Sequence, residues 1–165
     1  MREALLWDLK PDITIGIGLA GDRQTVSLEK VAINLAEARI PDNDGDQLID
    51  QIILSEGDTA YLSNLPLKAI ASKIPEAGFP VAISYPAGTF VCNSYLYHLL
   101  HLQSTSYPAM RAGFIHVPYC TEQLADKAEG TFSLSLETMV HALESVIRTS
   151  IEAVEATGLH EKSVR

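Results

Sequence analysis

Three residues of this chain, Cys92, His116 and Glu29, have the side chains that a cysteine hydrolase needs. Such an enzyme uses a thiolate as nucleophile, an imidazole that carries the proton to the leaving amine, and a group that holds the imidazole in one tautomer. Each residue also stands in an unusual place for its type. The three anomalies explain one another, because each residue supplies a partner that another one needs.

Cys92 stands where a strand, a tight loop and a helix meet. The run Val81-Ala82-Ile83 predicts a short buried strand, and Pro86 and Gly88 indicate a turn after it. A thiol in the first turn of a helix faces unpaired N–H groups and the positive end of the dipole, which favours the thiolate. The helix is predicted from Cys92 onward, because apolar residues recur with helical spacing at Cys92, Tyr95, Leu96, Leu99 and Leu100.

His116 and Glu29 both interrupt apolar strands. His116 comes near the end of the strand predicted over residues 113–117, and sites in parallel α/β sheets gather at the carboxyl ends of strands. Glu29 lies inside an alternating stretch, residues 25–34, where a carboxylate costs free energy unless it is paired. Taken singly, the histidine could be a satisfied core residue and the cysteine a small buried hydrophobic residue.

Other candidate residues and motifs fit a functional site less well. Cys120 follows a strand with no obvious base, and His98 and His101 fall on the surface or flank of the predicted helix. The spacing Gly16-x-Gly18-x-x-Gly21 matches a dinucleotide fingerprint, but β-branched, alternating residues follow it where that site needs a helix. The run 42–46 resembles a calcium loop, but Gln47 and Ile53 stand where an EF-hand needs glycine and glutamate.

The order of the predicted elements indicates an α/β fold with an open, mainly parallel twisted sheet and helices on both faces. Strands are predicted over 13–17, 25–34, 81–83 and 113–117, and helices near residues 1–9, 66–77 and from Cys92. Residues 49–54 suit a short strand or an extended loop. A long last helix follows, with Ser135 as N-cap, Gly158 as its end and an inner face of Leu136, Met139, Val140, Leu143, Ile147, Ile151 and Val154.

Composition narrows the classes of function. A chain of 165 residues is long enough for one domain, residues 1–165, with 159–165 as a flexible tail. The net charge of −9 argues against nucleic acid and against an anionic membrane surface as partners. No apolar run is long enough to span a bilayer, and two cysteines without a signal-peptide pattern indicate the cytoplasm.

Six segments together resemble the pyroglutamyl peptidase I family, also called pyrrolidone-carboxylate peptidases. Ser27-Leu-Glu29-Lys-Val-Ala-Ile-Asn34 is similar to the family's glutamate motif, and Ala87-Gly-Thr-Phe-Val-Cys92-Asn93 to its nucleophile motif. Gly113-Phe-Ile-His116-Val-Pro-Tyr119 is similar to its histidine motif, and residues 38–45, 59–66 and 133–137 also fit. The resemblance covers nearly the whole chain from Lys10 to the last helix.

The resemblance implies a cysteine peptidase that removes an N-terminal pyroglutamyl (5-oxoprolyl) residue from peptides. It assigns Cys92 as nucleophile, His116 as general base and acid, and Glu29 as the residue that orients the imidazole, with a thioacyl-enzyme between the two steps. The resemblance implies no metal and no cofactor. It also implies a homo-oligomer, which in the family is a tetramer. The substrate-binding residues that it implies are Phe90, Val91, Arg39, Ile40 and Leu19.

Two features depart from the family pattern. Family members begin with a strand, a Gly-Phe-Glu-Pro-Phe-Gly-Gly-like loop that lines the substrate pocket, a helix and a second strand, for which this sequence has no equivalent. Leu19 stands where many members carry a glutamine that contacts the lactam. Two alternatives follow: a non-catalytic or truncated relative that keeps the triad without the lactam pocket, or a natural protein that is longer because its start codon lies upstream.

Overall fold

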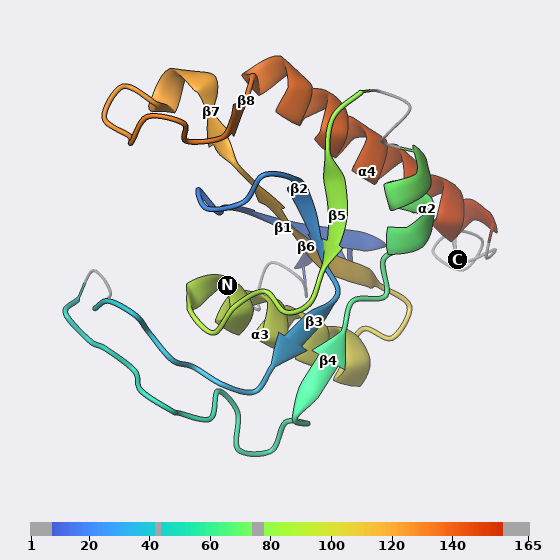
Figure 1. Cartoon of the computed structure of the whole chain (residues 1–165). Coiled ribbons are helices and arrows are strands. Elements are labelled where there is room, and N and C mark those ends of the chain that lie inside the picture. The colour runs from blue at the N-terminus through green and yellow to red at the C-terminus, as the bar shows by residue number, and fades with distance from the viewer. Residues whose placement is uncertain (1–7, 42–43, 74–77, 157–165) are drawn as a thin grey trace. The chain divides into compact units, whose positions relative to one another are not determined.

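The protein has an α/β fold in the computed structural model, which describes residues 8–41, 44–73 and 78–156 (Figure 1). Its main sheet is open, mixed and mainly parallel, with the strand order β1-β6-β2-β5. These predictions of fold class and sheet type are therefore confirmed. The strands of this sheet are β1 (Ile13–Leu19), β2 (Val26–Glu29), β5 (Val81–Ser84) and β6 (Arg111–Val117).

The described residues fall into two compact units that interleave along the chain. The first unit comprises Met1–Gly16, Glu29–Asn64 and Ser84–Gly113, and the second comprises Ile17–Leu28, Leu65–Ile83 and Phe114–Arg165. The expectation of one domain over residues 1–165 stays a prediction.

In the first unit, helix α3 (Val91–Thr105) lies beside a small two-stranded sheet (Figure 1). Strands β3 (Val31–Ile33) and β4 (Ala60–Leu62) form that sheet and pair in antiparallel register. The helix forms as the spacing predicts, but its buried face is shifted from the prediction. Cys92 and Tyr95 are only half-buried, and the buried positions are Asn93, Leu96, Tyr97, Leu99 and Leu100.

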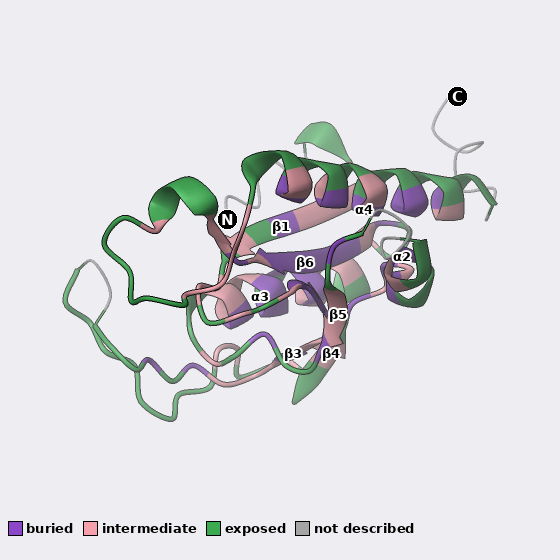
Figure 2. Cartoon of the chain, turned by 45° about the horizontal axis from the view of Figure 1, so that its top comes forward, coloured by how far each residue is buried: buried purple, intermediate pink, exposed green. Residues whose placement is uncertain are grey.

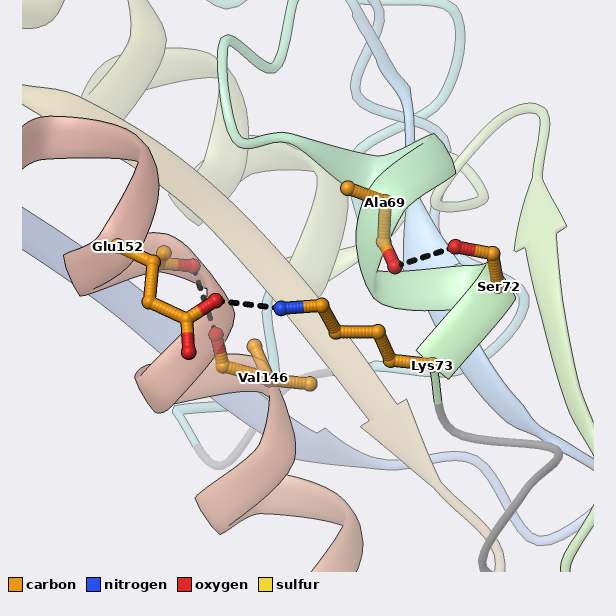
Figure 3. A network of polar contacts seen from close by, with 6 residues as sticks. Ala69, Ser72, Lys73, Val146 and Glu152 are labelled. Carbon is orange, nitrogen blue, oxygen red and sulfur yellow. Dashed lines mark hydrogen bonds and ion pairs between the residues drawn. The ribbon is translucent and has the colours of Figure 1, made fainter. Parts of the chain in front are cut away.

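In the second unit, α2 (Leu67–Lys73) packs on the long helix α4 (Leu136–Ala156). An ion pair between Lys73 and Glu152 joins the two helices (Figure 3). Because both side chains are about half exposed, this pair adds little to stability. The predicted N-cap of α4 is confirmed, since the Oγ of Ser135 accepts a hydrogen bond from the Thr138 N–H at 3.1 Å.

The predicted inner face of α4 is partly wrong. The buried positions run along one side of the helix (Figure 2) and are Met139, Ala142, Val146, Thr149, Ser150 and Val154. The hydroxyl of Ser150 on this side donates to the Val146 carbonyl at 2.8 Å, so the buried group is satisfied. Four larger apolar residues that were expected inside are instead exposed: Leu136, Val140, Ile147 and Ile151.

The strand predicted over residues 25–34 is split in two. Residues 26–29 join the main sheet as β2, whereas residues 31–33 form β3 in the small sheet. The break occurs at Lys30, whose N–H donates to the Ser84 carbonyl and whose carbonyl accepts from the Ser63 N–H, both at 2.9 Å. These two distant partners turn the chain from one sheet to the other.

Several short elements had no signal in the sequence. Strand β4 is one, and the others are the parallel pair β7 (Tyr119–Cys120) and β8 (Ser133–Leu134) and the 3₁₀ turn η2 (Thr121–Gln123). In residues 49–54 only an isolated bridge forms, between Ala36 and Gln51. The helix expected near residues 1–9 lies mostly outside the described residues, as do the helix end at Gly158 and the tail 159–165. Among residues 8–41, 44–73 and 78–156, no helix combines the length and apolar character needed to cross a membrane.

Candidate active site

Cys92 is the second residue of α3 and so lies in the first turn, as the sequence predicts, and its side chain is half-buried. The N-cap residue is Phe90, in an extended conformation. Its side chain has no polar atom, so it cannot satisfy the N–H groups of the first turn. The side chain of the N-cap residue therefore leaves these N–H groups to other partners, and a negatively charged group bound near the thiol would suit them.

The loop that leads into Cys92 is hydrogen-bonded to the segment that follows Glu29. The Ala87 N–H donates to the Val31 carbonyl at 3.3 Å. Further along, the Glu37 N–H donates to the Thr89 carbonyl at 2.8 Å, and the Thr89 hydroxyl donates back to the Glu37 carbonyl at 2.9 Å. The loop therefore runs alongside residues 31–37 up to the start of the helix.

Asn93, the neighbour of Cys92, fixes the first turn of α3 on the same segment. Its side chain is fully buried. The Oδ1 accepts from the Ile33 N–H at 3.0 Å, and the Nδ2 donates to the carbonyls of Ile33 and Leu35 at 2.9 and 3.0 Å. These hydrogen bonds hold the backbone at Cys92 in a set position relative to Ile33, which lies four residues after Glu29 in the sequence.

Glu29 and His116 both lie inside strands, as predicted, and both are buried. Glu29 is the last residue of β2 and belongs to the first unit together with Cys92, whereas His116 belongs to the second unit. His116 is 4% exposed in β6, and its ring packs edge-on against Phe114 with 4.9 Å between ring centroids.

Phe90 and Val91 line a groove of about 210 Å³ in the first unit. The opposite wall contains Ala38, directly before the exposed residues Arg39 and Ile40. The other lining residues are Ala36, Glu37, Asp46, Leu48, Thr89 and Ser94. Leu19, the last substrate-binding residue expected from the sequence, ends β1 in the second unit and is half exposed.

The glycine motif has a structural reason in the second unit. Gly21 lies in a turn, and a Cβ atom there would come within 2.2 Å of the Tyr119 ring. The segment after it forms β2, a strand, which confirms that the helix of a dinucleotide site is missing here. Across residues 8–41, 44–73 and 78–156, no three His, Cys, Asp or Glu side chains gather in a way that could hold a metal ion.

Two asparagines have structural roles that residue type alone does not predict. Besides Asn93, Asn34 organises the loop of residues 51–57, because its Oδ1 accepts from the N–H groups of Ile53 and Leu54, both at 2.9 Å. Its Nδ2 donates to the Leu54 carbonyl at 2.7 Å. An asparagine inside an apolar element must have its amide satisfied, so its position was the available signal. The partners could not be read from the sequence.

The family model described as pyroglutamyl peptidase matches residues 1–153 of the chain. The chain is 52% identical over 147 residues to the pyrrolidone-carboxylate peptidase of Enterococcus faecalis, covering 88% of this chain and 68% of the relative. It is 44% identical over 154 residues to that of Finegoldia magna, covering 92% and 72%.

Two solved structures show the same fold. The pyroglutamyl peptidase I of Bacillus amyloliquefaciens superposes with a TM-score of 0.85 at 44% identity, covering 89% of this chain and 69% of that one. The pyrrolidone carboxyl peptidase of Thermococcus litoralis superposes with a TM-score of 0.89 at 37% identity, covering 94% and 72%.

Proposed function

Because the chain belongs to the pyroglutamyl peptidase family, we propose that it is a cysteine peptidase that removes an N-terminal pyroglutamyl residue from peptides, with Cys92 as nucleophile. The observation that carries this proposal is the position of Cys92, a half-buried thiol in the first turn of α3. Asn93 and the preceding loop fix that turn, so the sulfur has a defined position for attack.

The reaction proceeds in two steps. The sulfur of Cys92 attacks the carbonyl carbon of the pyroglutamyl residue while His116 holds the thiol proton, and the C–N bond then breaks. The leaving amine departs with the proton from His116, and a thioacyl-enzyme remains. Water then attacks the thioester, His116 takes one of its protons, and pyroglutamate leaves as the sulfur recovers its electron pair.

In the same proposal Glu29 orients the imidazole of His116 and stabilises its charged form. Complete burial suits this role, because a carboxylate in a region of low dielectric attracts an imidazolium more strongly than one in water. The oxyanion of each tetrahedral intermediate is held by backbone N–H groups at the start of α3, including that of Cys92 itself.

The groove at Phe90 and Val91 is proposed as the site of the lactam ring. Its size of about 210 Å³ and its apolar lining suit a small uncharged ring. Arg39, Ile40 and Leu19 are further substrate-binding residues in this proposal, as the family resemblance implies. A leucine there gives apolar contact only, and no hydrogen bond to the lactam.

A second candidate function is a non-catalytic relative that keeps the triad residues and does not bind the lactam. Leu19 is the observation that favours it, since an apolar residue stands where many relatives carry a glutamine. A measurable rate of pyroglutamyl hydrolysis by this chain would exclude this alternative.

In this proposal the protein acts in the cytoplasm and forms a homo-oligomer, which is a tetramer as in the family. The exposed apolar residues Leu136, Val140, Ile147 and Ile151 along α4 support self-association, because they form one stripe on a single side of the helix. Cys92 and Cys120 are both free thiols, as expected for a reducing compartment.

Hydrolysis of a fluorogenic pyroglutamyl amide, measured with thiol present, tests the proposal. Cys92→Ala is expected to lower kcat by at least about a thousandfold with the fold intact. The matched control is Cys120→Ala, the same substitution at the other cysteine, which should keep nearly full activity. Full activity in Cys92→Ala, or loss only in Cys120→Ala, would overturn the proposal.

A further inference from the structure

A second and larger groove runs along the exposed side of α3. Its volume is about 610 Å³, and it is lined by Leu54, Val91, Ser94, Tyr95, His98, His101 and Leu102. We refer to it as the α3 groove. The residues on α3 recur at spacings of three and four, so they form one continuous stripe of the helix.

Leu54 is the lining residue that does not belong to α3, and partly buried polar contacts hold its loop in place. The side-chain amide of Asn34 bonds both the backbone N–H and the backbone carbonyl of Leu54. A little further along, the Tyr97 hydroxyl donates to the Asp58 carbonyl at 2.6 Å. Gly57 lies so close to this hydroxyl that a Cβ atom there would be 2.2 Å from it. The α3 groove is therefore preformed, and a ligand would not have to order it.

Two histidines give the groove defined polar groups. The Nδ1 of His98 lies 2.7 Å from the Ser94 carbonyl, which only accepts, so this nitrogen carries a proton. The Nδ1 of His101 lies 2.9 Å from the Tyr61 hydroxyl. Each ring is thus oriented through Nδ1, which leaves Nε2 as the nitrogen that a ligand can use. Tyr95 adds a neutral hydroxyl, whose pKa burial raises above its ordinary value of 10.0.

The α3 groove is continuous with the smaller groove assigned above to the lactam. Val91 and Ser94 line both of them, and Val91 directly precedes the nucleophile. A peptide whose first residue sits in the smaller groove can therefore continue along the helix without leaving the surface of this unit. The lining contains both apolar and hydrogen-bonding side chains, which suits a peptide, because a peptide presents both apolar side chains and backbone N–H and C=O groups.

We propose that the α3 groove binds the part of the substrate peptide that follows the scissile bond, with His98 and His101 bonding its backbone and Leu54 and Leu102 contacting apolar side chains. The proposal rests on the proposed function, which it extends from the lactam to the rest of the substrate. It makes the enzyme selective for peptides with apolar residues after the pyroglutamyl group.

The test compares two substrates with the same scissile bond, pyroglutamyl-leucine amide and pyroglutamyl-leucyl-leucyl-leucine amide. The quantity measured is the ratio of kcat/KM for the long substrate to that for the short one. We expect this ratio to fall about fivefold in His98→Ala and in Leu102→Ala, the effect of one hydrogen bond or one apolar contact. The matched controls His141→Ala and Leu143→Ala on α4 should leave the ratio unchanged.

An unchanged ratio in both groove variants would overturn the proposal, and so would an equal fall in the controls. If the stripe instead contacts a second copy of the chain, the groove variants would shift the elution volume and not the ratio. Binding of the two substrates to Cys92→Ala, measured by calorimetry, separates this inference from the proposed function. We expect Cys92→Ala to bind the long substrate more tightly than the short one, and this difference to disappear when His98→Ala is added. That result would support peptide binding in the α3 groove even without turnover.

Discussion

The side-chain amide of Asn93 pairs with the backbone of Ile33 as a neighbouring strand would. Its Oδ1 accepts from the Ile33 N–H at 3.0 Å while its Nδ2 donates to the Ile33 carbonyl at 2.9 Å. A buried amide with this many partners is costly to lose, because the groups left behind have no water to bond. This one side chain therefore does much to fix the start of α3, and with it Cys92, beside the contacts of the preceding loop.

Asn93→Ala should destabilise the protein and impair catalysis together. We expect the free energy of unfolding to fall by about 3 kcal/mol, since buried N–H and C=O groups lose their partner. We also expect kcat to fall by at least about tenfold, because the thiol is no longer held in one position. Urea unfolding and steady-state kinetics measure the two effects. Ser104→Ala on the exposed side of α3 serves as the control, and equal effects in both variants would contradict this role.

Gly57 and Tyr97 should show strong coupling. In Gly57→Ala the new methyl group would overlap the Tyr97 hydroxyl, which lies 2.2 Å away, whereas the ring carbon behind it is at 3.2 Å. Removing the hydroxyl in Tyr97→Phe should therefore relieve most of the cost of Gly57→Ala. A double-mutant cycle by urea unfolding is expected to give a coupling of at least about 1 kcal/mol. Additive effects would mean that the contact is not strained.

Much of this arrangement could be predicted from the sequence, and the reason is local periodicity. The helix at Cys92 and the strands at His116 and Glu29 follow from apolar spacing and from turn residues such as Pro86 and Gly88. The family resemblance, carried by residues around these three positions, added their expected roles, which stay a proposal.

What could not be predicted depends on partners far away in the chain. The division of residues 25–34 into two sheets is set at Lys30 by contacts to Ser84 and Ser63. The buried side of α4 is likewise determined by the elements that pack against the helix. Apolar residues occur on two sides of α4, and their periodicity alone does not show which side is buried. Asn93 and Asn34 bond to backbone groups of other segments. Every residue has such groups, so residue types do not reveal which segment an asparagine will bond.

Stability should depend on Tyr97 at high pH. Burial, followed by the neighbouring Tyr61 and Asp58, raises the pKa of Tyr97 from 10.0 to about 12. The folded state therefore keeps this proton more tightly than the unfolded state. The resulting stabilisation is complete below about pH 10 and is lost as the pH rises through about 12. Urea unfolding across this range should show a steeper loss for the wild type than for Tyr97→Phe. Parallel curves would contradict the raised pKa.

Leu19→Gln should improve the recognition of the lactam. The substitution supplies a polar side chain that can bond the lactam, and one added hydrogen bond corresponds to about fivefold in kcat/KM. Pyroglutamyl amide hydrolysis measures the effect. The control Leu62→Gln places the same change on another exposed leucine, in β4. If Leu19→Gln gives no higher kcat/KM than this control, Leu19 does not belong to the substrate site.

The central claim is that Cys92 forms a thioacyl-enzyme with the pyroglutamyl group. The most direct measurement is the intact mass of the protein after turnover of a pyroglutamyl amide is stopped with acid. The account predicts a fraction of the chain heavier by one pyroglutamyl acyl group, with the added mass on the peptide that contains Cys92. It also predicts that this species is absent in Cys92→Ala and present in Cys120→Ala. Turnover with the added mass on another residue would contradict the claim.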